Sequence, residues 1–290
     1  MKAGRFRVGI IGAGRVGPVI GRALQLVGHE IIGITRSSNP ERNDAAEAIL
    51  GVPVIEPDEA CQAELVVIAI PDDQIEPLIQ GLAKLGCFRP GQVVMHTSGV
   101  HGINVLEAAQ AAGALPIALH PAMTFTGTSL DVERLQMCPA AITATAVALP
   151  IASALAMEMG MEPCVVEEED RTLYHAGLTH GANHLVTLVN EALSILEAAG
   201  IENPELYIRP LLNAALERAL SEGAHGLTGP VRRADTGTLK DHQKALSEAG
   251  LNSILESYRN MARTTAHLAG DNLLLGENQV QAVLRALGEE

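Results

Sequence analysis

The amino-acid sequence predicts an α/β domain with a doubly wound parallel sheet, followed by an all-helical domain. As far as residue 168, short continuous apolar runs alternate with helical patterns, which is typical of parallel strands covered by helices on both faces. Beyond that point the pattern is helical, and glycines mark the breaks between helices. Because a chain of 290 residues has the length of about two domains, we expect a dinucleotide-binding domain over residues 1–168 and a substrate and dimerisation domain over residues 169–290.

The expected elements follow in order along the chain. Strands are expected at residues 8–11, 31–35, 52–55, 65–70, 92–96, 115–119, 140–145 and 164–166. Helices are expected between them at residues 21–27, 41–50, 75–85, 103–111 and 150–160. The second domain is predicted to hold helices at residues 171–199, 205–221, 235–248, 250–269 and 277–288.

A glycine motif follows the first predicted strand and opens the first helix. Gly12, Gly14 and Gly17 fit the pattern G-x-G-x-x-G. In a Rossmann-like domain the first glycine permits a tight turn, the second lets a pyrophosphate approach the backbone, and the third allows close packing of helix on strand. The helix N-terminus adds unpaired N–H groups and a positive dipole end. We therefore expect Gly12, Gly14, Arg15, Val16 and Gly17 to bind the pyrophosphate of a dinucleotide.

The residues after the second predicted strand favour NADP over NAD. An acidic residue there would bind the ribose 2′-hydroxyl of NAD, whereas an arginine accommodates the 2′-phosphate of NADP. This chain has Arg36, Ser37 and Ser38 at that place, and Glu30 precedes the strand. The alternative is that Arg36 is only a solvated loop residue.

Three further strand ends are expected to face the ligand, because carboxyl ends of parallel strands line the crevice of such sheets. Ile70 and Pro71 end one strand, Thr97 and Ser98 follow the next, and His120 follows the one after. The first four of these residues are expected to contact the cofactor. Ser98 and His120 are also candidate hydrogen-bond donors to a reacting group.

The first helix of the second domain carries a polar strip. At 100° per residue, Thr179, Asn183 and Asn190 fall within an arc of about 40°. Asn183 is a candidate catalytic residue, and the alternative for it, favoured for Asn190, is a hydrogen bond between helices. The same helix contains His175, His180 and His184. We expect no metal site there, because the H-E-x-x-H pattern is absent and no third ligand is evident.

A loop in the helical domain brings two arginines close to a helix start. Thr228 precedes a Gly-Pro turn, Arg232 and Arg233 follow it, and Asp235 is placed to cap the next helix. We expect Thr228, Arg233 and Asp235 to bind the substrate, with Arg233 as the receptor for a carboxylate. The alternative is a structural loop whose arginines pair with the acidic surface.

Composition and charge exclude several classes of protein. With 20 basic and 34 acidic residues the net charge is −14, and no basic face for nucleic acid is evident. No apolar stretch has the roughly 18 residues that a membrane-spanning helix needs, and no signal peptide is evident. The four scattered cysteines favour free thiols over a disulfide scaffold. We therefore expect a cytoplasmic protein.

In combination, these motifs resemble those of a family of Rossmann-like oxidoreductases. The helical C-terminal domain of that family was for a long time a domain of unknown function. The matching motifs are the N-terminal glycine motif, Thr97-Ser98-Gly99, His120-Pro121 with Phe125, Ala182-Asn183-His184-Leu185, and Thr228-Gly229-Pro230 with Arg233-Ala234-Asp235. The wider group is 6-phosphogluconate dehydrogenase-like. The resemblance implies NADPH, a small 2-keto acid and a homodimer built on the helical domain, and some members resemble an alternative type of ketopantoate reductase in pantothenate biosynthesis.

The chain departs from the wider group at one position. β-Hydroxyacid dehydrogenases carry a catalytic lysine four residues before the asparagine, where this chain has Thr179.

The sequence thus predicts an NADP-dependent oxidoreductase that reduces a small 2-keto acid, with ketopantoate reduction to pantoate as the best named reaction. His120 is expected to act as general acid, because a histidine titrates near neutral pH. Asn183 would hold the carbonyl or the nicotinamide amide, and Ser98 is another possible donor. Two alternatives stay open: an imine or pyrroline-carboxylate reductase, which the absent lysine favours, and a non-catalytic NADP-binding redox sensor.

Overall fold

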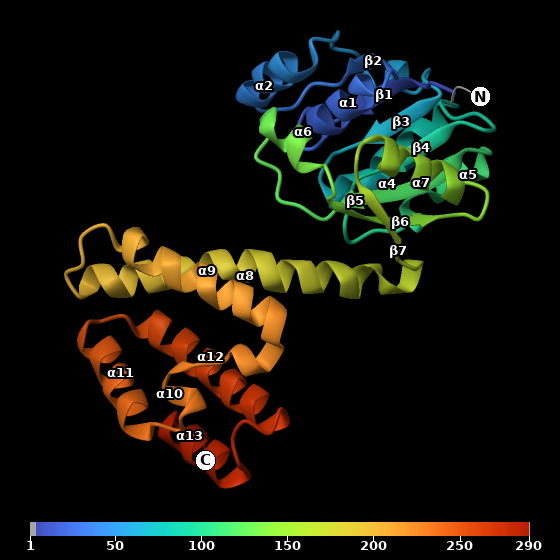
Figure 1. The fold of residues 1–290 in the computed structure, drawn as a ribbon. Helices are drawn as coiled ribbons and strands as arrows, with labels where there is room; N and C mark the ends of the chain where they lie inside the picture. Colours follow the sequence, from blue (N-terminus) through green and yellow to red (C-terminus); the bar gives the residue numbers. More distant parts are fainter. Residues whose placement is uncertain (1–3, 290) are drawn as a thin grey trace. The chain divides into compact units, whose positions relative to one another are not determined.

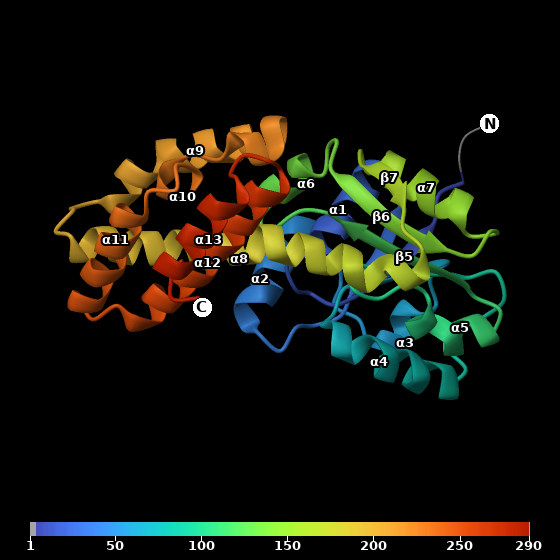
Figure 2. The same cartoon turned by 90° about the horizontal axis from the view of Figure 1, so that it is seen from below.

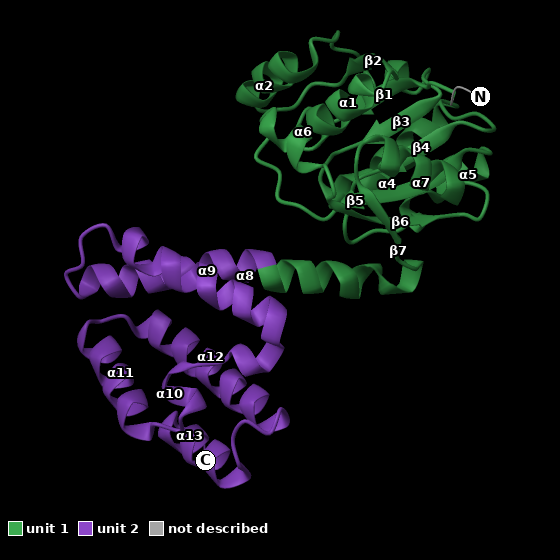
Figure 3. Ribbon diagram, viewed as in Figure 1, with its two compact units in different colours: residues 1–181 green, residues 182–290 purple. Residues whose placement is uncertain are grey.

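The structure is a computed structural model that describes residues 4–289. The chain divides into two compact units, Met1–Gly181 and Ala182–Glu290 (Figure 3). Helix α8 (Arg171–Ala198) begins in the first unit and ends in the second. The boundary between the compact units therefore falls inside a helix, whereas the boundary predicted after residue 168 lies just before that helix begins.

The first unit is built on a seven-stranded sheet with the order β2-β1-β3-β4-β5-β6-β7 (Figure 1). Its strands are β1 (Arg7–Ile11), β2 (Glu30–Ile34), β3 (Leu65–Ile68), β4 (Val93–His96), β5 (Leu115–Pro121), β6 (Pro139–Ala144) and β7 (Glu162–Val165). All neighbours are parallel except the antiparallel pair β5 and β6. The chain leaves β1 for β2 on one side and then places β3 on the other side of β1. This reversal is the point at which doubly wound sheets bind their ligands.

Helices cover both faces of this sheet because successive strand side chains point to opposite faces. Val8 and Ile10 belong to one apolar core, and Ile11 belongs to the other. The first core includes residues of α1 (Gly17–Leu26), α2 (Pro40–Leu50) and α7 (Leu149–Glu158), and the short α6 (Leu130–Arg134) contacts α1. The second includes residues of α3 (Pro57–Ala60), α4 (Asp72–Lys84) and α5 (Glu107–Ala111). Figure 2 shows α3, α4 and α5 together on one side of the sheet, with α1 and α7 on the other.

The second unit is helical. Besides the last part of α8 it contains α9 (Pro204–Glu222), α10 (Gly229–Arg232), α11 (Thr236–Glu248), α12 (Asn252–Asp271) and α13 (Glu277–Ala286). Its buried apolar cluster takes its members from α10 to α13 and the loop after α12, and none from α8 or α9. None of the helices in the described part of the chain combines the length and apolar character that a bilayer crossing demands.

The predicted fold class is confirmed, and the differences concern short elements. Residues 52–55 form only an isolated bridge between Ile34 and Val54. The predicted helix at residues 103–111 opens as a 3-10 turn, Asn104–Leu106, before α5. Helices α3, α6 and α10 were not predicted, because four or five residues are too few to show a 3.6-residue period.

The loop that precedes α6 depends on one buried carboxylate. Asp131 accepts hydrogen bonds from the backbone N–H groups of Thr126 and Gly127 at 2.7 and 2.8 Å, and Arg134 donates to it at 3.0 Å. These partners hold the pKa of Asp131 below its usual value, against the effect of burial. We expect Asp131→Ala to lower the free energy of unfolding by about 3 kcal/mol, because the loop loses its charge-assisted hydrogen bonds to a buried carboxylate. Urea unfolding measures this loss, and Glu133→Ala on the exposed side of α6 is the matched control. A loss no larger than the control's would contradict the assignment.

Candidate functional site

The glycine turn after β1 has the backbone that the motif requires. Gly12 has φ +117°, and a methyl group there would overlap the carbonyl oxygen of Ala69. Its N–H donates to the hydroxyl of Thr35 at 2.9 Å. A methyl group at Gly17 would overlap the carbonyl oxygen of Gly12. The first and third glycines are therefore required by the protein's own packing.

Gly14 differs from these two glycines because nothing in the protein fills the space beside it. The nearest atom to a methyl group at Gly14 would be the carbonyl oxygen of Ala69, at 3.9 Å. Helix α1 starts three residues later, and Val16 caps it without a side-chain hydrogen bond. The open space and the N-terminal N–H groups fit the approach of a dinucleotide pyrophosphate.

The segment after β2 has the donors expected for a 2′-phosphate. Arg36 is exposed and lines a cavity of about 300 Å³ together with Thr35 and Asn43, and Asp44 and Glu47 line it as well. The loop is held by Asn43, whose side chain accepts from the N–H of Ser37 at 2.7 Å and donates to its carbonyl at 3.0 Å. Glu30 begins β2 at the far end of the strand, 3.9 Å from Arg7. It is thus too far from the loop to oppose a phosphate.

A second arginine, which the sequence analysis missed, lies near this segment. A methyl group at Gly127 would lie 3.0 Å from a guanidinium nitrogen of Arg42 and 3.1 Å from Cγ of Arg15. No carboxylate among residues 4–289 forms an ion pair with Arg15, Arg36 or Arg42. The structure therefore gathers cationic side chains around the glycine turn although the chain as a whole is acidic.

The end of β3 lies beside the glycine turn, and the end of β4 lies next to β3. Ile70 follows β3, and its Cγ2 would lie 3.0 Å from a methyl group at Gly12. Pro71 is exposed and precedes α4, and Thr97 follows β4 with its N–H donating to the carbonyl of Ile68 at 3.1 Å. These three residues therefore stand at the carboxyl edge of the sheet, at the point where the strand order reverses.

Ser98 is buried and takes part in a loop held by His96. The ring of His96 accepts from the N–H of Ser98 at 3.1 Å and contacts the carbonyl oxygen of Gly102 at 2.7 Å through Nε2. The hydroxyl of Ser98 accepts from the N–H of His101 at 3.2 Å. Burial lowers the pKa of His96 to about 4, so its ring is neutral at pH 7. The hydrogen bonds of Ser98 thus support the loop, and a role in chemistry stays a prediction.

His120 lies beside this loop and is paired with a residue that the sequence analysis did not single out. Its Nδ1 lies 2.9 Å from the hydroxyl oxygen of Tyr174, and the two rings are nearly perpendicular. The ring of His175 stands edge-on to it, with centroids 6.3 Å apart. A methyl group at Gly99 would lie 2.7 Å from Cδ2 of His175 and 3.0 Å from Nε2 of His120. The glycine after Ser98 therefore leaves room for both imidazole rings.

A buried cation stands behind this cluster. Arg171, the first residue of α8, is 1% exposed. Its guanidinium donates to the hydroxyl of Thr143 at 2.7 Å and to the carbonyl oxygens of Ala118 and Ala141 at 3.0 and 3.1 Å. Burial, assisted by Arg171, lowers the pKa of His120 to about 4. At neutral pH His120 is therefore uncharged, and its role as a general acid stays a prediction.

The remaining predicted site residues lie in the second unit. Asn183 is exposed on α8, whereas Asn190 donates to the carbonyl of Val186 in its own helix at 2.8 Å. Thr228 precedes α10, and Arg233 is exposed. The side chain of Asp235 accepts from the N–H of Thr238 at 3.1 Å, which confirms its predicted role as a helix cap. No group of three or more His, Cys, Asp or Glu residues in the described chain is arranged to hold a metal ion.

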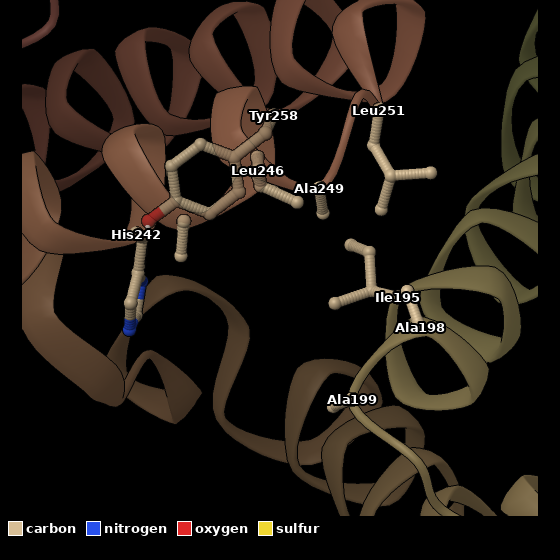
Figure 4. A pocket seen from close by; sticks show the side chains of 9 residues that line it. Ile195, Ala198, Ala199, His242, Leu246, Ala249, Leu251 and Tyr258 are labelled. Carbon is tan, nitrogen blue, oxygen red and sulfur yellow. Dashed lines mark hydrogen bonds between the residues drawn. The ribbon is translucent and has the colours of Figure 1, made fainter.

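The second unit also contains an apolar cavity of about 370 Å³. Ile195 and Ala198 of α8 face Leu246 and Leu251 across it, and Figure 4 shows the hydroxyl of Tyr258 close to the ring of His242 at one side. Those two groups are 2.9 Å apart. No lining residue is an acid or a lysine or arginine, so this cavity has no anion-binding group of its own.

Two family profiles match the chain in succession. A Rossmann-like domain matches residues 1–121, and a domain of unknown function, DUF2520, matches residues 138–265. No curated protein matches the sequence.

Solved structures resemble the chain over most of its length. One, provisionally named an NADP oxidoreductase, from Bacteroides fragilis, has a TM-score of 0.75 at 19% identity and covers 90% of this chain and 98% of its own. The imine reductase from Myxococcus stipitatus in complex with NADP+ has a TM-score of 0.66 at 15% identity, with coverages of 91% and 95%. A pyrroline-5-carboxylate reductase from Coxiella burnetii has a TM-score of 0.54 at 17% identity, with coverages of 99% and 100%.

At these identities the likeness establishes the fold alone, which the chain shares with proteins named as an NADP oxidoreductase and an imine reductase. The two profiles agree with the resemblance drawn from the motifs. The chain therefore matches the Rossmann-like domain over residues 1–121 and DUF2520 over residues 138–265, a range that includes β6, α7 and β7 of the first unit.

Proposed function

We propose that the protein is an NADPH-dependent reductase of a small 2-keto acid. One observation supports the assignment of a dinucleotide cofactor. The backbone is open at Gly14, close to the helix N-terminus, whereas packing in the protein requires glycine at Gly12 and Gly17. Arg36 and the loop held by Asn43 are suited to the 2′-phosphate. Structures of similar fold are named as binding NADP+. A reduced nicotinamide would supply a hydride to the substrate carbon.

The chain's own residues would bind the acid and hold the group that is reduced. Arg233 is exposed and suited to a carboxylate. His120 and Asn183 are the candidate hydrogen-bond donors to a carbonyl oxygen that gains negative charge. Ketopantoate is the named substrate that we propose, because it is a 2-keto acid and because the chain resembles an alternative type of ketopantoate reductase.

A substrate panel tests this proposal. Purified protein with NADPH should oxidise the cofactor when ketopantoate or a related 2-keto acid is added, as followed by loss of NADPH absorbance. The reverse outcome, turnover of 1-pyrroline carboxylates but of no keto acid, would favour an imine reductase. That second candidate has one specific observation behind it: Thr179 stands at the place of the lysine that supplies a proton in β-hydroxyacid dehydrogenases. Tight NADPH binding with no turnover of any substrate would point to a redox sensor.

Asn183→Ala should separate cofactor binding from turnover. We expect the dissociation constant for NADPH to stay within about twofold and kcat/KM to fall about 100-fold, equivalent to about 2.8 kcal/mol. Fluorescence titration and initial rates give the two numbers. Asn190→Ala is the matched control on the same helix, and an Asn183→Ala variant as active as this control would remove Asn183 from the site.

Arg36→Ala should weaken NADPH much more than NADH. A charge-assisted contact to the 2′-phosphate is lost with the guanidinium, and we expect the dissociation constant for NADPH to rise about 30-fold, or about 2 kcal/mol. NADH, which lacks that phosphate, should bind as before. Isothermal titration of both cofactors checks this, with the exposed Arg285→Ala as control. Equal weakening of both cofactors would contradict the assigned contact.

We also propose that the protein is a homodimer through its helical unit. Helices α8 and α9 contribute nothing to the buried cluster of that unit, yet they expose large apolar side chains, including Leu185, Leu206, Leu211, Leu216 and Leu220. Such a surface is large for a monomer to leave in water. Sedimentation should give twice the chain mass of 30.4 kDa, and Leu211→Glu should give monomers while Leu26→Glu on α1 should not. Wild-type monomers at micromolar concentration would refute the dimer.

A further inference from the structure

Tyr174 and His120 form a pair that leaves one imidazole nitrogen for a ligand. The phenol oxygen lies 2.9 Å from Nδ1 of His120. Nε2 is on the other side of the ring, where it faces Gly99 and makes no hydrogen bond among residues 4–289. Because His120 is only half-buried and its Nδ1 is engaged by Tyr174, an acceptor atom that reaches this ring meets Nε2.

The direction of the hydrogen bond follows from the phenol. Tyr174 is half-buried, and its hydroxyl has no other hydrogen-bond partner among residues 4–289. If Nδ1 carried the proton, the hydroxyl hydrogen would have no acceptor in the protein, which is costly in a half-buried position. The phenol therefore donates to Nδ1, and a neutral His120 carries its proton on Nε2.

The groups around His120 oppose a second proton on the ring. Arg171 is buried with no carboxylate in its hydrogen-bond set, since its acceptors are the Thr143 hydroxyl and three backbone carbonyls. His175 faces the ring edge-on and disfavours the second proton, whereas Asp72 favours it. The pKa of His120 is accordingly lowered to about 4. The ring thus works as a neutral donor throughout the physiological pH range.

We propose, on the basis of the reductase function proposed above, that Tyr174 is a positioning residue that keeps the His120 proton on Nε2 and aims it at the acceptor atom of the substrate. As hydride from a reduced nicotinamide reaches the substrate carbon, the Nε2 proton passes to the carbonyl oxygen or neutral imine nitrogen. The phenol proton passes to Nδ1, and the phenolate, three residues from the Arg171 guanidinium, takes a proton from water. The donor also selects an uncharged acceptor, since a permanently cationic iminium has no lone pair for Nε2–H.

Histidine nitrogen NMR on the full chain tests the tautomer without any substrate. We expect the wild-type spectrum to show His120 with its proton on Nε2, and Tyr174→Phe to give a mixture of tautomers. Tyr258→Phe is the matched control, because Tyr258 pairs with His242 at the same distance of 2.9 Å. A wild-type His120 protonated on Nδ1, or a Tyr174→Phe spectrum identical to wild type, would overturn the proposal.

Kinetics tests the coupling between the two residues. With a keto acid from the panel, Tyr174→Phe should lower kcat about tenfold with KM unchanged, and His120→Ala should lower kcat at least 100-fold. The double variant should be no slower than His120→Ala, because Tyr174 acts only through His120. Independent, multiplying losses would overturn the positioning role, as would turnover of 1-methyl-1-pyrrolinium, a permanent cation, at the rate of the keto acid. If no substrate oxidises NADPH, both the proposed reductase function and the proposed proton transfer are refuted. The NMR spectrum still tests separately which nitrogen of His120 carries the proton.

Discussion

Gly14→Ala is expected to leave the fold intact and to weaken NADPH binding about 100-fold, equivalent to about 2.8 kcal/mol. A methyl group at this position would meet no protein atom closer than 3.9 Å, so the protein itself tolerates it. The same methyl group would occupy the space through which a pyrophosphate approaches the backbone. Thermal unfolding and isothermal titration with NADPH measure the two effects separately.

Two other glycine-to-alanine variants serve as controls for Gly14→Ala. Gly12→Ala adds a methyl group that overlaps the carbonyl of Ala69 at a residue with φ +117°, and it should destabilise the fold itself. Gly81→Ala lies in α4, where a methyl group would meet nothing within 4 Å, and it should stabilise the helix slightly without affecting NADPH. Unchanged NADPH affinity in a folded Gly14→Ala variant would show that no dinucleotide binds at this turn.

The stability of the first unit is expected to fall as the pH is lowered from about 6.5 to 4. His96 has a pKa of about 4 in the folded chain, because it is buried, whereas an unfolded chain takes up this proton near pH 6.5. Between these values the unfolded state binds more protons, so acid favours unfolding. The lost stability is about 3 kcal/mol for this histidine alone, at 1.36 kcal/mol for each pH unit.

His96→Gln isolates this contribution. The amide can accept from Ser98 and donate to Gly102 as the imidazole does, yet it does not titrate. Urea unfolding at pH 7 and pH 4.5 should therefore show a smaller loss of stability in this variant than in wild type. His101→Gln in the same loop, whose ring makes no hydrogen bond in the described chain, is the control. Equal acid sensitivity of wild type and His96→Gln would refute the assignment.

The sequence was sufficient to predict the sheet, because its strands are buried on both faces and show as unbroken apolar runs such as Leu65–Ile68. It was also sufficient for the glycine turn, since Gly12 and Gly17 are required by local packing that the motif itself encodes. Short helices such as α3 could not be predicted, because four residues are too few to show the 3.6-residue period of a helix. The place where a strand ends, and so the residues at the sheet edge, could be predicted to within one or two positions.

The partners of His120 could not be predicted in the same way. Tyr174 and Arg171 lie more than 50 residues away in the chain, and an Arg-x-x-Tyr-His sequence at a helix start is typical of a solvated helix end. The one available signal was indirect. Gly99 indicates that other side chains pack closely against the backbone at that position, but the sequence does not show that these are His120 and His175, which belong to other elements. For the same reason the low pKa of His120 could not be foreseen, because it follows from the burial of the ring and from Arg171 beside it.

The two tyrosine–histidine pairs have an optical consequence. The chain has no tryptophan and only three tyrosines, and two of these, Tyr174 and Tyr258, lie against histidine nitrogens. Burial raises the pKa of both phenols. The near-ultraviolet spectrum of this protein is therefore largely a spectrum of these two pairs, without an indole background. Ionisation of Tyr174 during turnover would thus be visible directly, with Tyr174→Phe and Tyr258→Phe assigning each signal to its residue.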